Sequence, residues 1–415
     1  MEKIFLATNV AEYSYSRLIE DLNAKGDYSV YVYVKYNHPY KIFLSIIHSL
    51  IYKYSIEILD GDFSAQELQA LGIDPNRLEI TRPVEKRLHI DSLDTLLDRV
   101  KDQDTWTLTL YTSGTTGRPK KVSHHLKTLI RNVRCSGKYS NNVWAFAYNP
   151  THMAGLQVFF QALWNHNTII YAFGGEQRNL PSLLQEYEIT HISATSTFYR
   201  NAIPFMKGRE FPQVRRITFG GEKYDSGLEQ QIKSIFTNAE IRNVYASTET
   251  GSLFVSKGNL FQIPDSIREQ IRISERNELF IHCSLLGQSD SFSLEGEWFN
   301  TGDLVEQIDE CLFKFTSRKS ELINVGGYKV NPVEVENILL KVPGVIDLLV
   351  KGRENRVTGQ ILVADVVKSA NADDQDLKRS IKHYAASCLQ EWKVPRLINF
   401  VDSLPRTRTG KKVRK

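Results

Sequence analysis

Between Thr107 and Tyr245 the apolar residues alternate between a spacing typical of strands and one typical of helices. Short apolar runs at His191–Ala194 and Arg216–Phe219 end in small residues, as buried strands do. Between such runs, apolar residues recur at i, i+3, i+4 and i+7, which is one face of a helix. These helical positions are Leu126, Leu129, Ile130 and Val133, and then Leu156, Phe159, Phe160 and Leu163. A further helix carries Leu228, Ile232, Ile235 and Phe236, at i, i+4, i+7 and i+8. The alternation predicts an α/β fold: a large N-terminal domain with a mainly parallel sheet and helices on both faces.

Three predicted turns fall at the carboxyl edge of this sheet, where ligands gather in folds of this class. One follows the strand that begins near Leu108, one is Gly220-Gly221, and one is Ala246–Glu249. Ser123, which follows the first turn, is expected to cap the next helix.

After about Asn300 the pattern changes to that of a small α+β domain. Asn331 and Glu334 predict a capping box around Pro332, at the start of a helix. Two strands and two amphipathic helices follow. The strands are Val345–Val350 and Gln360–Val367, and the helical faces are Val335, Ile338, Leu339 and Val342, then Leu377, Ile381, Tyr384 and Cys388. A polar stretch near Thr316–Glu321 separates the domains, which we expect at residues 1–317 and 321–415.

Composition narrows the class of protein without naming a function. The 415 residues are 41% hydrophobic and 24% charged, which is typical of a globular protein of two domains or more. With 52 basic and 48 acidic residues the charge is too balanced to indicate nucleic acid, although it suits an anionic substrate. The apolar stretch Ile42–Tyr52 is too short for a membrane span, and no signal peptide is expected. Four scattered cysteines without a Cys-x-x-Cys pair indicate reduced thiols and a cytoplasmic location.

The loop Leu110–Lys120 carries the strongest chemical signal in the chain. It reads Leu-Tyr-Thr-Ser-Gly-Thr-Thr-Gly-Arg-Pro-Lys, and a further lysine follows at Lys121. Its glycines, hydroxyls and cations can surround a polyphosphate. It is not a Walker A loop, because Gly114 and Gly117 are three apart and no Gly-Lys-Ser/Thr follows. A plain surface turn of the same composition is the alternative.

Seven segments in sequence order carry a family resemblance. They are Tyr111–Lys120, Asn149–Leu156, Phe219–Glu222, Tyr245–Glu249, Trp298–Asp303, Arg318 with Gly326–Glu336, and Leu404–Lys411. Together they resemble the motifs of the adenylate-forming superfamily of acyl- and aryl-CoA synthetases, adenylation domains and luciferases. The resemblance implies two half-reactions. A carboxylate attacks the α-phosphate of Mg-ATP, giving an acyl adenylate and pyrophosphate; a thiol then takes the acyl group and releases AMP.

The resemblance also implies roles for individual residues. Lys411 would neutralise the two anions that meet in the first step, with Thr248 at the α-phosphate and Glu249 as a Mg²⁺ ligand. Residues expected at the nucleotide are Thr112, Ser113, Gly114, Thr115, Thr116, Gly117, Lys120, Gly221, Glu222, Tyr245, Ala246, Ser247, Asp303 and Arg318. Those expected at the acid are His152, Gly220, Gly221, Ala246 and Ser247. Coenzyme A would meet Gly326, Gly327 and Tyr328, while the C-terminal domain would turn about residues 318–320, with Ser320 in the hinge.

Taken singly, five of these residues have ordinary structural alternatives. These are a surface or N-cap carboxylate for Glu249, a core side chain for Tyr245, a turn former for Asp303, a structural histidine for His152 and a solvated basic tail for Lys411.

The segment Pro150–Gly155 lacks the aspartate with which adenylation domains pair an α-ammonium group. A buried unpaired ammonium would be costly, so an aryl or fatty acid is expected.

Three departures accompany the resemblance. The region before the phosphate loop is short, and only Lys41–Leu71 resembles the family there, as helix, strand and helix. Part of the pocket wall is therefore expected to be missing, open, or supplied by a second subunit in a homodimer. Ser320 stands where the family has Asp or Lys. Residues 251–297 match nothing beyond strand character. The phosphopantetheine of an acyl carrier protein is the alternative thiol, and a non-catalytic nucleotide-binding relic is the alternative of another class.

Overall fold

The computed structural model describes residues 2–24, 29–101, 103–112, 120–175, 177–222, 226–355, 359–406 and 412–414. The chain divides into two compact units, Met1–Pro264 with His282–Glu297, and Asp265–Ile281 with Trp298–Lys415. The expected hinge at residues 318–320 lies inside the second unit by this division, and the boundary at residue 317 stays a prediction.

Six parallel strands form the centre of the first unit. In sheet order they are β1 (Ile4–Ala7), β10 (Thr168–Tyr171), β9 (Val143–Phe146), β11 (His191–Ala194), β12 (Arg216–Gly220) and β13 (Glu240–Ser247). Antiparallel strands extend both ends: β2 (Glu12–Ser14) beside β1, and β14 (Gly251–Lys257) and β15 (Leu260–Gln262) beyond β13. The α/β class with a parallel central sheet is confirmed.

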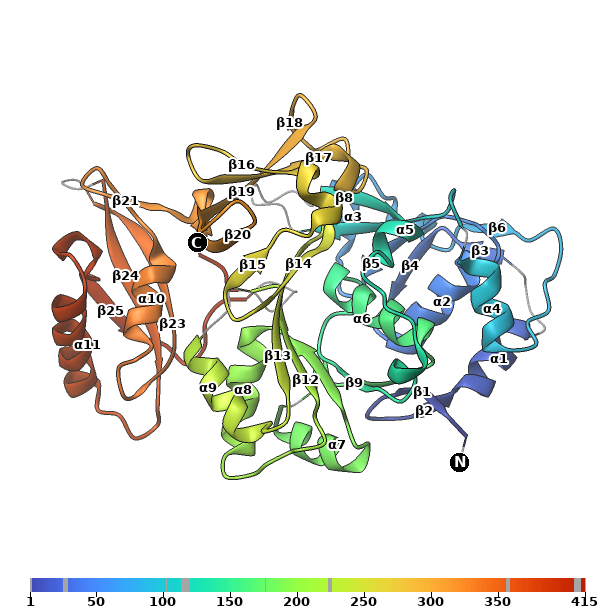
Figure 1. The fold of residues 1–415 in the computed structure, drawn as a ribbon, viewed down its shortest axis with the longest axis horizontal. Helices are drawn as coiled ribbons and strands as arrows, with labels where there is room; N and C mark the ends of the chain where they lie inside the picture. The colour runs from blue at the N-terminus through green and yellow to red at the C-terminus, as the bar shows by residue number, and fades with distance from the viewer. Residues whose placement is uncertain are drawn as a thin grey trace. The chain divides into compact units, whose positions relative to one another are not determined.

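The central sheet has a helical layer on each face, because its side chains alternate between two cores. Trp144 and Phe146 of β9 pack into one core, while Ala145 packs into the other. The first core is covered by α1 (Tyr15–Asn23), α2 (Pro39–Ile51), α4 (Leu93–Val100) and α6 (Met153–Trp164), and the second by α7 (Leu180–Glu186), α8 (Ser196–Met206) and α9 (Ser226–Ile235), as Figure 1 shows. Every residue of β11 is buried, as expected for a strand covered on both faces.

A second, four-stranded sheet carries the predicted phosphate loop. Its order is β4 (Tyr33–Tyr36), β5 (Ile56–Asp60), β7 (Thr107–Thr112) and β8 (Lys120–His125), with β7 and β8 antiparallel. Helix α3 (Ala65–Ala70) follows β5, so the expected helix, strand and helix within Lys41–Leu71 are confirmed. A small pair, β3 (Ser29–Tyr31) and β6 (Thr81–Pro83), completes this region.

The expected N-cap at Ser123 is wrong. Ser123 lies inside β8 opposite Thr109, and the two hydroxyls are 2.8 Å apart. Helix α5 (Leu126–Leu129) is a single turn that begins after His125. The apolar spacing is helical here, but the hairpin takes up the backbone of Ser123 before a helix can start.

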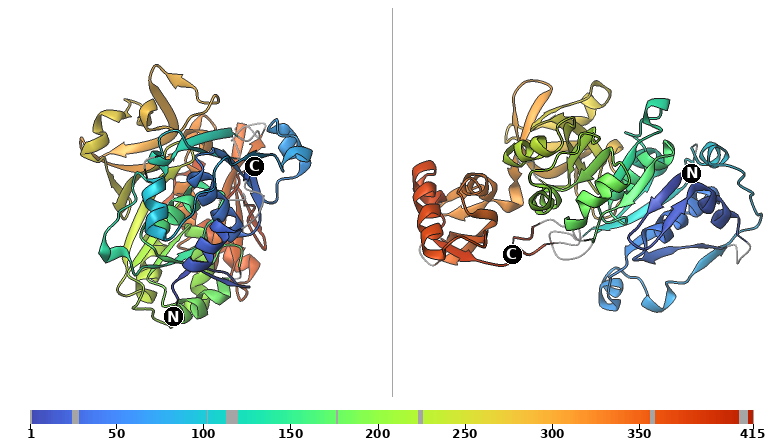
Figure 2. Two further views of the ribbon diagram at one scale, coloured as in Figure 1. Left: turned by 90° about the vertical axis from the view of Figure 1, so that its right-hand side faces the viewer. Right: turned by 90° about the horizontal axis from the view of Figure 1, so that it is seen from below.

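The second unit combines a strand segment with an α+β body. Strands β16 (Ile271–Ile273), β17 (Glu278–His282), β19 (Trp298–Gln307) and β20 (Leu312–Arg318) are neighbours in that order. The short strand β18 (Leu294–Glu295), which precedes β19 in the chain, belongs to the first unit. The body, orange to red in Figure 2, contains β21 (Ile323–Val325), β22 (Tyr328–Val330), β23 (Val345–Asn355), β24 (Gly359–Lys368) and β25 (Leu397–Phe400), with α10 (Pro332–Leu339) and α11 (Asp374–Cys388). Both predicted helices and both predicted strands of this domain are confirmed.

The capping box predicted around Pro332 is half right. Asn331 accepts a hydrogen bond from the Val333 N–H at 3.0 Å and caps α10. Glu334 does not reach back to the cap; its carboxylate accepts two hydrogen bonds from Lys393, at 2.7 and 2.9 Å. A tertiary ion pair has replaced the local contact. None of the helices in the described parts of the chain is long and apolar enough to cross a membrane.

Candidate active site

The predicted phosphate loop connects the two strands of a hairpin. Thr112 at the end of β7 is paired with Lys120 at the start of β8. Ser113, Gly114, Thr115, Thr116 and Gly117 lie outside the described residues, as does Lys411. The roles expected for these six residues therefore stay predictions.

Glu57 of β5 holds the base of this hairpin. Its carboxylate accepts a hydrogen bond from the Tyr111 hydroxyl and pairs with the Lys121 ammonium at 2.6 Å. Burial, reinforced by Glu57, raises the pKa of Tyr111, which stays protonated and can donate. Because Lys121 pairs with Glu57, Lys120 is the one of these two described neighbouring lysines that remains available to a phosphate.

The backbone of Thr248 and Glu249, in the turn after β13, accepts two hydrogen bonds from other parts of the chain. The Gly287 N–H donates to the Glu249 carbonyl at 2.7 Å, and the His124 ring lies 2.6 Å from the Thr248 carbonyl. The Glu249 side chain is half-buried. Within the part of the chain that the structure describes, no basic side chain forms an ion pair with it, so its carboxylate fits a magnesium ligand.

His124 supports the site although it lies in none of the seven motifs. It is fully buried, and burial lowers its pKa to about 4, so the ring is neutral near pH 7 and its Nε2–H donates to Thr248. Gly287 packs on the same ring: a Cβ there would lie 2.5 Å from the His124 Cε1 atom. The two residues together fix the backbone that carries Thr248 and Glu249.

His152 stands at the N-terminus of α6, next to a buried carboxylate. Its Nε2 atom is 3.2 Å from Oδ1 of Asp60, the last residue of β5. Asp60 also accepts hydrogen bonds from the Asn149 amide at 3.0 Å and from the Thr151 hydroxyl. Asp60 belongs to none of the predicted site residues, although its place directly after the apolar run Ile56–Leu59 was a usable signal.

The residues expected around the acid and the nucleobase lie at the carboxyl ends of adjacent parallel strands. Gly220 ends β12, and Ala246 and Ser247 end β13, its neighbour in the sheet. A Cβ on Gly220 would lie 3.0 Å from the Tyr148 hydroxyl, a tight contact that would have to be relieved by a shift of that side chain. Figure 1 shows β12 and β13 side by side.

Glu222 and Tyr245 each make a contact within the protein. One Glu222 oxygen accepts the Thr197 N–H at 2.7 Å, at the start of α8. The half-buried Tyr245 ring lies 5.6 Å from the Phe254 ring, centroid to centroid. These contacts fix the two side chains, and their roles at the nucleotide stay predictions.

In the second unit, the two residues expected at the ribose lie opposite each other. Asp303 of β19 is paired in register with Arg318 of β20, and the Arg318 Nε–H donates to Asp303 Oδ1 at 2.7 Å. Ser320 follows in the 3₁₀ turn Lys319–Glu321, where Lys319 pairs with Glu278 at 2.5 Å. The carboxylate of Asp303 is thus oriented before any sugar binds.

The three residues expected at coenzyme A form the turn and edge of a hairpin. Gly326 and Gly327 have φ values of +59° and +88°, which glycine adopts without strain, and the Tyr328 ring stacks on Trp392 at 4.4 Å. Beside them is a cavity of about 180 Å³. It is lined by Val325, Gly326, Tyr328, Ile361, Leu362, Glu391, Trp392, Val394 and Arg396.

Two family models match this chain. The family model described as "AMP-binding enzyme" matches residues 55–272, and its "AMP-binding enzyme C-terminal domain" matches residues 334–411. The 2-succinylbenzoate–CoA ligase of Listeria monocytogenes serotype 4b is 25% identical over 332 residues, which are 74% of this chain and 70% of the ligase.

Two solved structures share the fold over the full chain. Both are of o-succinylbenzoate CoA synthetase from Bacillus subtilis. One holds its acyl-adenylate intermediate, with 20% identity, a TM-score of 0.72 and coverage of 100% of this chain and 94% of the other. The other, with ATP and a magnesium ion, has 19% identity, a TM-score of 0.72 and coverage of 100% and 96%.

Proposed function

The chain belongs to the family of AMP-binding enzymes, and from this premise we propose how its residues join a carboxylic acid to a thiol. It is an AMP-forming acid–thiol ligase. ATP converts the acid to an acyl adenylate with loss of pyrophosphate, and the thiol of coenzyme A then takes the acyl group and releases AMP. Little covalent help is needed in the first step, so positioning and charge stabilisation dominate.

The half-buried carboxylate of Glu249 carries the proposal for the nucleotide site. Two hydrogen bonds hold the backbone that carries this side chain: Gly287 donates to the Glu249 carbonyl, and His124 donates to the Thr248 carbonyl. Glu249 lies at the carboxyl edge of the sheet. Together with phosphate oxygens and waters it would complete the octahedral shell that magnesium requires. When bound, the ion supplies positive charge to the phosphates; Lys120 and the hydroxyls of the phosphate loop hold them in place.

The proposed acid is an aryl or fatty acid without an α-amino group. Asp60 contacts the predicted pocket segment, and its carboxylate is already used by Asn149, Thr151 and His152. A substrate ammonium would have to displace these partners, which supports an acid lacking that group. The small residues Gly220, Ala246 and Ser247 leave room for an acyl chain or a ring.

Coenzyme A is the thiol that the residues of the second unit favour. The Gly326-Gly327 turn and the aromatic pair Tyr328 and Trp392 border a cavity. Arg396 also lines it and pairs with the exposed Glu391 at 3.1 Å, a partner that a phosphate would have to displace. The phosphopantetheine of an acyl carrier protein is the alternative acceptor. A homodimer and a cytoplasmic location also stay predictions. The four free cysteine thiols are consistent with a reducing compartment such as the cytoplasm.

Acid-dependent exchange of labelled pyrophosphate into ATP tests the first half-reaction. A panel of aryl, short-chain and long-chain acids identifies the substrate class, and thioester formation with coenzyme A or with a carrier protein identifies the acceptor. Exchange should require both an acid and magnesium. A complete lack of exchange over the panel, from a folded protein that binds ATP, would indicate a non-catalytic nucleotide-binding protein and overturn the proposal.

Lys411 provides the sharpest variant of this assay. The structure describes its basic neighbours Lys412 and Arg414, which are bound to Asp347 and Glu336, so the tail is not simply solvated. We expect Lys411→Ala to lose adenylate formation by roughly a hundred- to a thousandfold, as when one positioned donor is removed. It should still convert a supplied acyl adenylate to the thioester. Equal loss of both steps, with Lys382→Ala as the unaffected control, would contradict this division of roles.

A further inference from the structure

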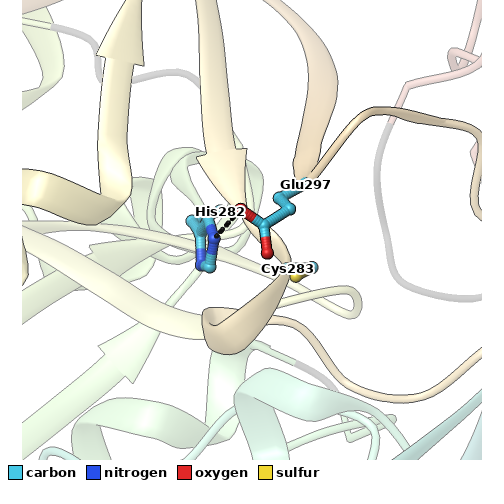
Figure 3. A group of neighbouring side chains, drawn as sticks. All are labelled: His282, Cys283 and Glu297. Atoms are coloured by element: carbon cyan, nitrogen blue, oxygen red, sulfur yellow. Dashed lines mark ion pairs between the residues drawn. The ribbon is translucent and has the colours of Figure 1, made fainter.

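Three metal-binding side chains meet in the segment that resembled no family motif. His282 ends β17, Cys283 follows it, and Glu297 precedes β19. One ligand atom from each of the three lies within 4.8 Å of the other two. Figure 3 shows the imidazole facing the carboxylate of Glu297, with the Cys283 sulfur beside them. This cluster takes no part in the chemistry proposed above.

The backbone holds the cluster together without any metal. The Cys283 N–H donates to the Glu297 carbonyl at 2.8 Å, so residues far apart in sequence stay adjacent. Between them the chain contacts the first unit's site: Gly287 donates to the Glu249 carbonyl, and Gln288 pairs with Ser123. The ligands therefore close the base of a loop that supports Glu249.

The His282 ring is oriented for a ligand at Nε2. Its Nδ1 atom lies 2.8 Å from the Ser284 hydroxyl, the kind of outer hydrogen bond that orients metal-binding histidines. Without a metal, Nδ1 accepts a hydrogen bond from the Ser284 N–H at 3.3 Å. A metal at Nε2 would move the ring proton to Nδ1, which would then donate to the Ser284 hydroxyl instead. Nε2 is 3.6 Å from the Glu297 oxygen, which is too long for a hydrogen bond.

That separation fits two ligands of one tetrahedral ion. Zinc bonds of about 2.0 to 2.2 Å to nitrogen and oxygen in tetrahedral geometry place these two ligand atoms roughly 3.3 to 3.5 Å apart, close to the separation observed. Glu297 is 78% exposed, and among the described residues no lysine or arginine forms an ion pair with it. Sulfur with nitrogen selects zinc or cobalt, whereas magnesium prefers oxygen ligands alone.

We propose that His282, Cys283 and Glu297 form a binding site for one zinc-type divalent cation, separate from the magnesium of ATP. The Cys283 thiol loses its proton to solvent as the sulfur–metal bond forms, and a water fills the fourth position. Binding closes the 282–297 loop and stabilises the folded chain, by an amount that grows with the ratio of free metal to its dissociation constant.

Cobalt(II) titration of the full chain, freed of metal with a chelator, tests the site. We expect one cobalt per chain, a thiolate-to-metal charge-transfer band in the near ultraviolet, and d–d bands of tetrahedral intensity. Zinc should displace cobalt and raise the melting temperature. Cys283→Ser should abolish the charge-transfer band, whereas His282→Gln and Glu297→Gln should keep the thiol but weaken binding at least tenfold.

Two matched controls keep this result specific. Cys311 is also a partly buried free thiol and His89 is an exposed histidine, so Cys311→Ser and His89→Gln should bind cobalt as the parent does. If the parent shows no charge-transfer band, or if the band survives Cys283→Ser, the proposal is wrong. If Cys283→Ser fails to fold, unchanged affinity in folded His282→Gln and Glu297→Gln overturns it equally. Pyrophosphate exchange by the chelated protein separates this outcome from failure of the proposed function.

Discussion

At the scale of single residues, Asp60 changes the interpretation of His152. A lone histidine before an apolar helix has an ordinary structural alternative, whereas here Nε2 lies 3.2 Å from a carboxylate that also holds Asn149 and Thr151. The pair orders the whole Asn149–His152 turn. Asp60 therefore positions the predicted acid pocket without needing to contact the substrate.

We expect Asp60→Asn to raise KM for the acid more than KM for ATP. The amide keeps the shape of the side chain but removes its charge, and a hydrogen bond to a charged group contributes about 1.5 to 3 kcal/mol, or roughly ten- to a hundredfold. Steady-state exchange kinetics with each substrate varied in turn measure the difference. Asp62→Asn, at an exposed neighbouring position, is the control. An equal effect on both substrates would show that Asp60 supports the fold only.

Protonation of His124 should make the protein less stable in mild acid. Its pKa is lowered by burial to about 4 in the folded state, from about 6.5 when unfolded, so the unfolded chain binds a proton first as the pH falls. Stability from this group is therefore complete above pH 7 and declines between about pH 6.5 and 4. The expected loss from pH 7 to pH 5 is about 2 kcal/mol.

Urea unfolding at the two pH values measures this loss. His124→Gln keeps a donor for the Thr248 carbonyl but cannot titrate, so its stability should change less between pH 7 and 5 than that of the parent. His89→Gln, whose parent side chain is exposed, should behave like the parent. The same pH dependence in His124→Gln would place the titration on another group, such as the buried His191.

At the scale of elements, apolar periodicity predicted most of what was observed, and tertiary contacts explain the exceptions. Helices α6, α9 and α11 and strands β11 and β12 lie where the spacing placed them, because each buries the face that the pattern defines. The pattern around Leu126 is equally helical, yet the hairpin of β7 and β8 uses Ser123. No local pattern encodes the pairing of Ser123 with Thr109 and Gln288, so the sequence could not reveal it.

The start of α6 depends on the absence of a side chain at Gly155. A Cβ there would lie 2.4 Å from the Asn149 carbonyl oxygen and 3.0 Å from the Phe146 ring. We expect Gly155→Ala to cost about 1 to 3 kcal/mol of stability, as overpacking does, and to lower activity through the adjacent His152. Chemical denaturation measures the cost. Gly137→Ala, with no atom within 4 Å of the added Cβ, should be neutral; a neutral Gly155→Ala would show that the turn can shift.

At the scale of the whole molecule, seven short motifs predicted the family. The contacts made by residues outside these motifs could not be predicted from the sequence. Motif residues such as Asp303 and Arg318 meet in the structure because antiparallel strands bring them into register. Several residues outside the motifs acquire a role only through a contact formed on folding. His124 contacts Thr248, Lys319 pairs with Glu278, and His282 lies beside Glu297. Each such contact joins side chains whose types are common everywhere, so only the three-dimensional arrangement distinguishes them.

The two half-reactions should require different backbone conformations at Ser320. If the C-terminal domain turns about residues 318–320 between steps, the backbone there must adopt two conformations. Ser320 lies in the 3₁₀ turn Lys319–Glu321, where a proline would fix φ near −65° and favour the conformation present. We therefore expect Ser320→Pro to affect the two steps unequally, by tenfold or more in their ratio, while Ser320→Ala leaves that ratio near the parent's. Single-turnover assays of adenylate formation and of thioester formation from supplied adenylate measure it. A folded Ser320→Pro variant with both rates unchanged would locate the rotation elsewhere in the chain.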